Sequence, residues 1–200
     1  MGLDMIAVES KAESNAADAR TRVMAVAMES FRNLGFRRSS MDAIAKSARM
    51  SKRTLYACFP DKHAVLEAVL TDFITRQFNA IGRLSTQSTG SRAALVTIGR
   101  ELQRASNDDA SLAMYRVLIA EADHMPALSD RTNRMGVAQV LELVRGPLHN
   151  LGIDDSATAA RILYDLLVVA PLHKRLMNME PEPIDIEDVI HLIERGMTGS

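Results

Sequence analysis

The chain has 200 residues, of which 47% are hydrophobic and 24% charged, and its formal net charge at pH 7 is −1. This composition is ordinary for a globular protein and excludes a disordered tail protein or a low-complexity scaffold. The single cysteine, Cys58, excludes an intramolecular disulfide framework, so nothing points to an oxidising compartment.

Neither membrane insertion nor export is indicated by the sequence. The longest apolar run, residues 166–172, is far shorter than the ~20 residues that a membrane-spanning helix needs. The N-terminal segment carries Asp4 and Glu9 around a short apolar stretch, which differs from a secretory signal. We therefore expect a cytoplasmic protein with no membrane partner.

The near-zero net charge conceals an uneven distribution along the chain. Between Asp18 and His63 there are ten Lys/Arg against four acidic residues, whereas from Leu84 to the end there are eleven against sixteen. A basic N-terminal third on an acidic remainder favours a polyanion-binding head attached to a body with another role.

After a short N-terminal segment, apolar residues in the N-terminal third of the chain recur with helical spacing. Residues 1–17 are small, polar and uneven, and predict a mobile arm. A helix is then expected from about Ala19 to Leu34, with Gly35 ending it. Its apolar stripe consists of Val23, Ala27, Phe31 and Leu34.

Two short helices come next, over about 41–48 and from 51 to about 58, joined by the break Arg49-Met50-Ser51. Ser39 or Ser40 is the expected N-cap of the first, and Ser51 of the second. With the supporting helix before them, they predict a helix-turn-helix. The second helix points Leu55 inward and presents a polar outer face that suits the DNA major groove. That face carries Lys52, Arg53 and Tyr56, flanked by Ser51 and Thr54.

A fourth helix, capped by Asp61 and running to about Ile81, leads into the rest of the chain. The stretch 85–91 is rich in Ser, Thr and Gly and predicts a loop between a head (18–83) and a body (84–200). Body helices are expected near 91–106, 110–124, 127–146, 155–177 and 186–196. Gly146-Pro147 should end the third of these, and Pro171 should kink the fourth. The expected fold is all-α.

The segment from Gly35-Phe36 to Asp61-Lys62 carries a set of residue types at fixed spacing. Its characteristic positions also include Ser39, Ser40, Met41, Ile44, Ala45, Ala48, Ser51, Thr54, Leu55, Tyr56 and Phe59. In these residue types and their spacing the head resembles the TetR family of transcriptional regulators. Three positions depart from the pattern: Arg49, where the family often has Gly, Cys58 and His63.

The resemblance implies a homodimer that binds a palindromic double-stranded DNA operator and usually acts as a repressor. The expected DNA contacts are Ser39, Ser40, Arg49, Ser51, Lys52, Arg53, Thr54, Tyr56 and Lys62. Lys62 opposes the dipole of its helix, a placement that a phosphate partner would explain. Dimerisation is expected through the last two helices, where Ile162 to Leu172 is strongly apolar and Ile186, Ile190 and Ile193 form a stripe.

The resemblance also implies that a small-molecule effector binds inside the body. Many methionines and few aromatic residues favour a mainly apolar effector, although ordinary core packing is a better explanation than ligand contact for any single one of these residues. The candidate ligand-binding residues are Met114, Tyr115, Val117, Leu118, Glu121, Leu141, Val144, Leu163, Tyr164 and Leu167.

Two other functional classes stay open at the level of sequence. One is a helical lipophile-binding protein or enzyme whose basic head is incidental, and the other is a DNA-binding protein without a ligand. No nucleophile elbow, Gly-rich phosphate loop or paired catalytic carboxylates occur, so we expect neither an enzyme nor a cofactor. Glu121, Asp123 and His124 lie close in sequence but lack a further ligand at helical spacing, so no metal is expected.

Overall fold

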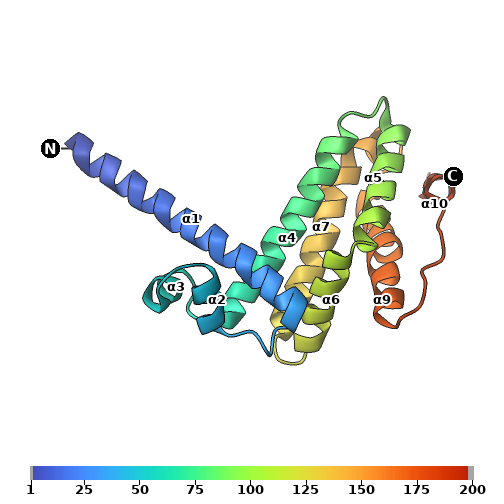
Figure 1. Ribbon diagram of the computed structural model, residues 1–200. Coiled ribbons are helices and arrows are strands. Elements are labelled where there is room, and N and C mark those ends of the chain that lie inside the picture. Colours follow the sequence, from blue (N-terminus) through green and yellow to red (C-terminus); the bar gives the residue numbers. More distant parts are fainter. Residues whose placement is uncertain (1, 198–200) are drawn as a thin grey trace. The chain divides into compact units, whose positions relative to one another are not determined.

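The computed structural model describes the backbone of residues 2–197 and the side chains of residues 15–197. Every regular element in this range is a helix, which confirms the expected all-α fold. The chain divides into two compact units, Met1–Asp72 and Phe73–Ser200. The division falls inside α4 (Lys62–Ser85), earlier in the chain than the loop predicted to separate head and body (Figure 1).

The N-terminal unit contains α1 (Gly2–Leu34), α2 (Met41–Ser47), α3 (Lys52–Cys58) and the first part of α4. α1 begins well before the predicted start at Ala19, so the predicted arm over 1–17 is helical from Gly2 onward. The physical reason is composition, since this segment contains four Ala, two Glu and two Met, which favour helix. Met1 lies outside the described residues.

The core of this unit comes from the predicted apolar stripe of α1, with one exception. Val23, Ala27 and Phe31 are buried, and α1 contacts both α2 and α3. Leu34 is instead 54% exposed, because Phe36 beyond the turn packs against Phe31 with their ring centroids 5.4 Å apart. Phe36, which follows α1, therefore extends the core in place of Leu34 at the end of α1.

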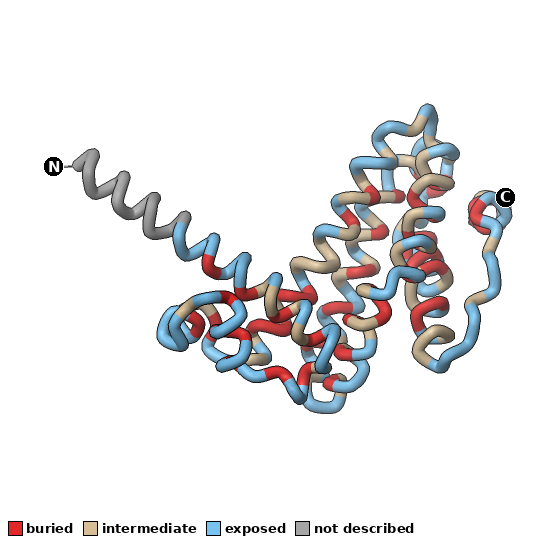
Figure 2. Tube along the Cα trace, viewed as in Figure 1, coloured by how far each residue is buried: buried red, intermediate tan, exposed pale blue. Residues whose placement is uncertain are grey.

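The C-terminal unit takes up the rest of α4 and all later helices. These are α5 (Ser91–Ser106), α6 (Asp109–Glu121), α7 (Pro126–Asn150), α8 (Ser156–Tyr164), the π-helical segment η1 (Asp165–Val169), α9 (Ala170–Leu176) and α10 (Ile186–Met197). α4, α5, α7, α8, η1 and α10 contribute buried positions to one hydrophobic core, and buried positions are red in Figure 2. Ile98, Val144 and Leu167 are among its fully buried side chains. Of the helices between Gly2 and Met197, none combines the length and apolarity that crossing a membrane requires.

Two prolines lie inside helices of the C-terminal unit. Pro147 does not end α7, which continues to Asn150 with the proline inside it. Ahead of Pro171 the helix widens into η1, where the amide of Ala170 donates to the carbonyl of Asp165. A π-helical turn is a common way to accommodate an interruption in the normal hydrogen-bond ladder. The predicted helix over 155–177 is therefore divided into α8, η1 and α9.

Two glycines allow close helix contacts in the C-terminal unit. A Cβ atom on Gly99 of α5 would lie 2.4 Å from Cγ2 of Ile186 of α10, and a Cβ on Gly136 of α7 would lie 2.3 Å from the Tyr164 hydroxyl. The α10 stripe of Ile186, Ile190 and Ile193 is buried in the core of its own chain. The prediction that this stripe forms a dimer interface is therefore wrong, because α5 already covers it.

Candidate nucleic-acid interface

The helix-turn-helix begins with a capped α2. The side chain of Ser40 accepts a hydrogen bond from the amide of Ala43 at 3.2 Å, which makes Ser40 the N-cap. The sequence left Ser39 and Ser40 as alternative N-caps, and the structure selects Ser40. The Ser40 side chain is exposed.

Ser39 lies on the inner side of the same turn. It is 3% exposed, and its hydroxyl donates to the carbonyl of Gly35 at 2.9 Å and pairs with the Ser30 hydroxyl at 2.7 Å. A buried hydroxyl with these partners stabilises the turn after α1. The prediction that its side chain contacts DNA is wrong for that reason, and the polar role of Ser39 is internal.

The turn between α2 and α3 is a Schellman motif closed by an arginine. The amide of Arg49 donates to Lys46 at 3.1 Å and the amide of Met50 donates to Ala45 at 3.0 Å. Arg49 has a φ of 54°, in the left-handed region where glycine is the usual residue. The turn keeps its geometry despite the departure from glycine, and the arginine side chain is exposed.

Replacing Arg49 with glycine is expected to raise the free energy of unfolding of the N-terminal unit by about 1 kcal/mol, because glycine adopts a positive φ without a Cβ clash. Urea denaturation followed by circular dichroism measures the change. Arg49→Ala is the matched control, since it removes the charge and keeps the Cβ. Equal stabilisation by alanine and glycine would contradict backbone strain as the cause.

α3 presents the polar face that its sequence predicts. Ser51 is the N-cap, with its hydroxyl accepting from the Thr54 amide at 3.1 Å. Leu55 is fully buried and anchors the helix to the unit. The outward face is exposed and consists of Ser51, Lys52, Arg53, Thr54 and Tyr56. These groups are those that read base edges and phosphates in a major groove.

The two cations at the start of α3 have different surroundings. The ammonium of Lys52 contacts the carboxylate of Asp42 in α2 at 2.6 Å, and hydrogen bonding to that carboxylate raises the pKa of Lys52. The guanidinium of Arg53 has no hydrogen bond or ion pair within the described part of the chain. Arg53 is therefore free to meet a ligand, whereas Lys52 must first leave or share Asp42. No local sequence pattern suggested this pair.

Lys62 is held inside the unit. Its half-buried ammonium donates to the carbonyls of Phe36 at 2.8 Å and Ser39 at 2.9 Å, and lies 4.3 Å from the centroid of the Phe36 ring. These partners explain a cation in the first turn of α4 without a phosphate. In place of the predicted phosphate contact, Lys62 therefore stabilises the connection between α1 and α2.

Arg20 is a positioning residue that sequence reasoning missed. Its guanidinium donates to the carbonyl of Cys58, the last residue of α3, at 2.6 Å, and lies 4.2 Å from the centroid of the Phe59 ring. Cations at a helix C-terminus satisfy carbonyls that lack intrahelical partners. Arg20 thereby fixes α3 to α1 across a long sequence separation, which no local pattern reveals.

The candidate effector residues lie in the C-terminal unit, mostly in its core. Val144 and Leu167 are fully buried, while Leu118 and Leu141 are partly exposed. Burial raises the pKa of Tyr115, and burial with the neighbouring Tyr115 raises that of Tyr164 to about 12. Buried or nearly buried positions also include Met114, Val117, Glu121 and Leu163.

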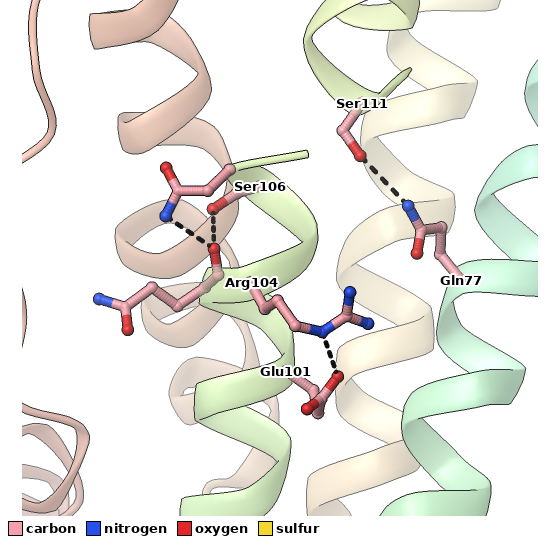
Figure 3. Close-up of polar contacts among 7 residues, drawn as sticks. Gln77, Glu101, Arg104, Ser106 and Ser111 are labelled. Carbon is pink, nitrogen blue, oxygen red and sulfur yellow. Dashed lines mark hydrogen bonds and ion pairs between the residues drawn. The ribbon is translucent and has the colours of Figure 1, made fainter. Parts of the chain in front are cut away.

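A few polar groups accompany these side chains inside the unit. Gln77 of α4 donates to the hydroxyl of the buried Ser111 of α6 at 3.2 Å, a contact that the sequence did not suggest (Figure 3). The hydroxyl of Ser129 in α7 is buried and has no hydrogen-bond partner among the described residues. Thr132, one turn further along α7, is also buried. Across the portion of the chain that is described, no three His, Cys, Asp or Glu side chains come together as a metal site would require.

Two segments of the chain, one from each unit, match family models of transcriptional regulators. Residues 23–69 match the family model of bacterial regulatory proteins, tetR family, and residues 93–197 match that of the AefR-like transcriptional repressor, C-terminal domain.

Individual relatives agree with this assignment. The chain is 28% identical over 174 residues to the HTH-type transcriptional regulator UidR of Escherichia coli, covering 74% of this chain and 89% of the relative. It is 29% identical over 180 residues to the HTH-type transcriptional regulator Rv1556 of Mycobacterium tuberculosis, covering 85% of each. A TetR-family regulator structure from Mesorhizobium loti superposes with a TM-score of 0.72 at 22% identity, covering 91% of this chain and 96% of that one.

Proposed function

The chain belongs to the TetR family of bacterial DNA-binding transcriptional regulators, and we propose that it is a cytoplasmic repressor. In this proposal a homodimer binds a palindromic operator and leaves it when a small, mainly apolar effector binds the body. The match of residues 93–197 to a repressor's C-terminal domain supports the sign of regulation. The observation that carries the proposal is the exposed polar face of α3 above its buried anchor, Leu55.

Arg53 is the proposed principal base reader. Bound sequences selected from random duplex DNA should form an inverted repeat, since a two-fold dimer reads two equivalent half-sites. Arg53→Ala should weaken the selected operator by about 1–3 kcal/mol and relax preference at one base of each half-site. Arg32→Ala, which removes an exposed cation from α1, is the control. Unchanged base preference in Arg53→Ala would overturn this role.

Salt dependence separates a regulator from a protein whose basic head is incidental. Phosphate contacts release counterions, so the logarithm of the binding constant should fall linearly with the logarithm of salt concentration. If the basic head has no role in DNA binding, selection from random duplex DNA should yield no preferred sequence, and no operator affinity could be measured.

Dimerisation is proposed through the outer faces of α8 and α10. Ile162 of α8 is 42% exposed and Leu192 of α10 is 68% exposed, although Ile186, Val189, Ile190 and Ile193 of α10 are buried in their own chain. Large exposed aliphatic side chains favour association. A monomer in analytical ultracentrifugation at micromolar concentration, both alone and with operator DNA, would exclude this arrangement.

The effector is proposed to contact the partly exposed apolar positions Leu118 and Leu141, with polar groups setting its orientation. Ser129 supports this view, because its buried hydroxyl lacks a partner among the described residues. A hundredfold weakening of operator binding requires about 2.7 kcal/mol of coupling, and operator must weaken the effector equally. Effector affinity measured with and without operator tests this reciprocity. A compound that binds equally in both is no effector, and a screen without any binder favours a regulator that needs no ligand.

A further inference from the structure

The contact between Asp42 and Lys52 joins the two helices of the helix-turn-helix on their exposed side. Asp42 lies in the first turn of α2 and Lys52 in the first turn of α3, and their charged atoms are 2.6 Å apart. The two side chains are 62% and 65% exposed, so nothing in the protein covers the pair. It therefore lies where it can respond to an approaching polyanion.

The pair changes what α3 offers to DNA. Lys52 could neutralise a phosphate, but in this arrangement it already neutralises a carboxylate of its own chain. A phosphate that recruits Lys52 must compete with Asp42 for the ammonium or share it, and the nearby carboxylate repels the DNA backbone. Arg53, the adjacent residue, has no such partner within the described part of the chain. Lys52 is thus engaged by a carboxylate of its own chain, whereas the neighbouring Arg53 is available to bind DNA.

We propose that Asp42 restrains Lys52 and so lowers the sequence-independent, electrostatic affinity of the helix-turn-helix for DNA. This inference rests on the proposed function as an operator-binding regulator. Phosphate contacts supply essentially all of non-specific binding and carry no sequence information. Withholding one of them therefore lowers the affinity for random sequence, which depends on phosphate contacts.

The test compares wild type with Asp42→Asn, which keeps the shape of the side chain and removes its charge. On random-sequence duplex DNA, freeing Lys52 should steepen the log–log salt slope by about 0.9, one released counterion for each additional phosphate. Affinity for that DNA should rise by roughly eightfold at 0.1 M salt, the gain that this slope gives relative to 1 M.

Two further variants tie the effect to the pair. In a Lys52→Met background, Asp42→Asn should leave the salt slope unchanged, because no restrained cation remains. Glu29→Gln removes an exposed carboxylate from α1 and should leave the slope at the wild-type value. An unchanged slope in Asp42→Asn, or the same increase in the Lys52→Met background, would overturn the inference. Failure of the wild-type protein to select any sequence would instead overturn the proposed function.

Discussion

Replacing Lys62 with methionine is expected to lower the free energy of unfolding of the N-terminal unit by about 3 kcal/mol, the upper range for hydrogen bonds made by a charged donor. Methionine keeps most of the aliphatic stem and removes the ammonium that binds the carbonyls of Phe36 and Ser39. Those carbonyls then lose a partner in the half-buried connection between α1 and α2. Urea denaturation followed by circular dichroism measures the loss.

Lys46→Met is the matched control for this experiment, since Lys46 is an exposed cation in the last turn of α2. It should leave stability nearly unchanged. If Lys62→Met is as stable as wild type but binds all DNA sequences more weakly, with a salt slope flatter by about one, then Lys62 contacts phosphate after all.

Gly136→Ala is expected to destabilise the C-terminal unit by about 3 kcal/mol, at the upper end of the usual range for overpacking. The added methyl would lie 2.3–2.5 Å from the hydroxyl, Cζ and Cε2 atoms of Tyr164. These atoms belong to a rigid ring in a buried side chain, so the ring cannot yield without opening the contact between α7 and α8. Thermal and urea unfolding report the change.

Gly146→Ala provides a control within the same helix. A Cβ at Gly146 would have no neighbouring atom within 4 Å, so alanine there should stabilise α7 by about 0.5–1 kcal/mol through backbone entropy. Combining Gly136→Ala with Tyr164→Ala should cost less than the two single changes together, because the clash disappears. Strict additivity would show that Gly136 is required for a reason other than the tyrosine.

The features that the sequence predicted well depend on residues a few positions apart. Ser51 caps α3 through an amide three residues away, and Leu55 lies on the inward face that helical spacing assigns to it. A capping hydroxyl and an amphipathic stripe are local patterns, so the linear sequence contains them. Arg49 likewise occupies a position where the family often has glycine, and its φ of 54° lies in the left-handed region that favours glycine.

The features that the sequence did not predict depend on distant partners. Lys62 meets Phe36 and Ser39, and Arg20 meets Cys58, only once the helices have packed. Within its local sequence Lys62 has no partner, and for that reason the sequence predicted a contact with DNA phosphate.

The proline in α7 was misjudged for a related reason. One missing amide weakens a helix by about 3 kcal/mol, yet packing along the rest of a long helix can offset that loss. α7 accordingly continues past Pro147 to Asn150, with Val144 and Leu148 buried on either side of it.

The left-handed arginine at the end of α2 also bears on how this chain can evolve. Every arginine codon becomes a glycine codon when its first base changes to guanine, so the unstrained residue is one point mutation away. That mutation would exchange a positive charge on the reading head for about 1 kcal/mol of stability. Proteins need only stay above a stability threshold, so a regulator that has stability to spare can retain the arginine. A lineage with a less stable head would be the one to fix the glycine.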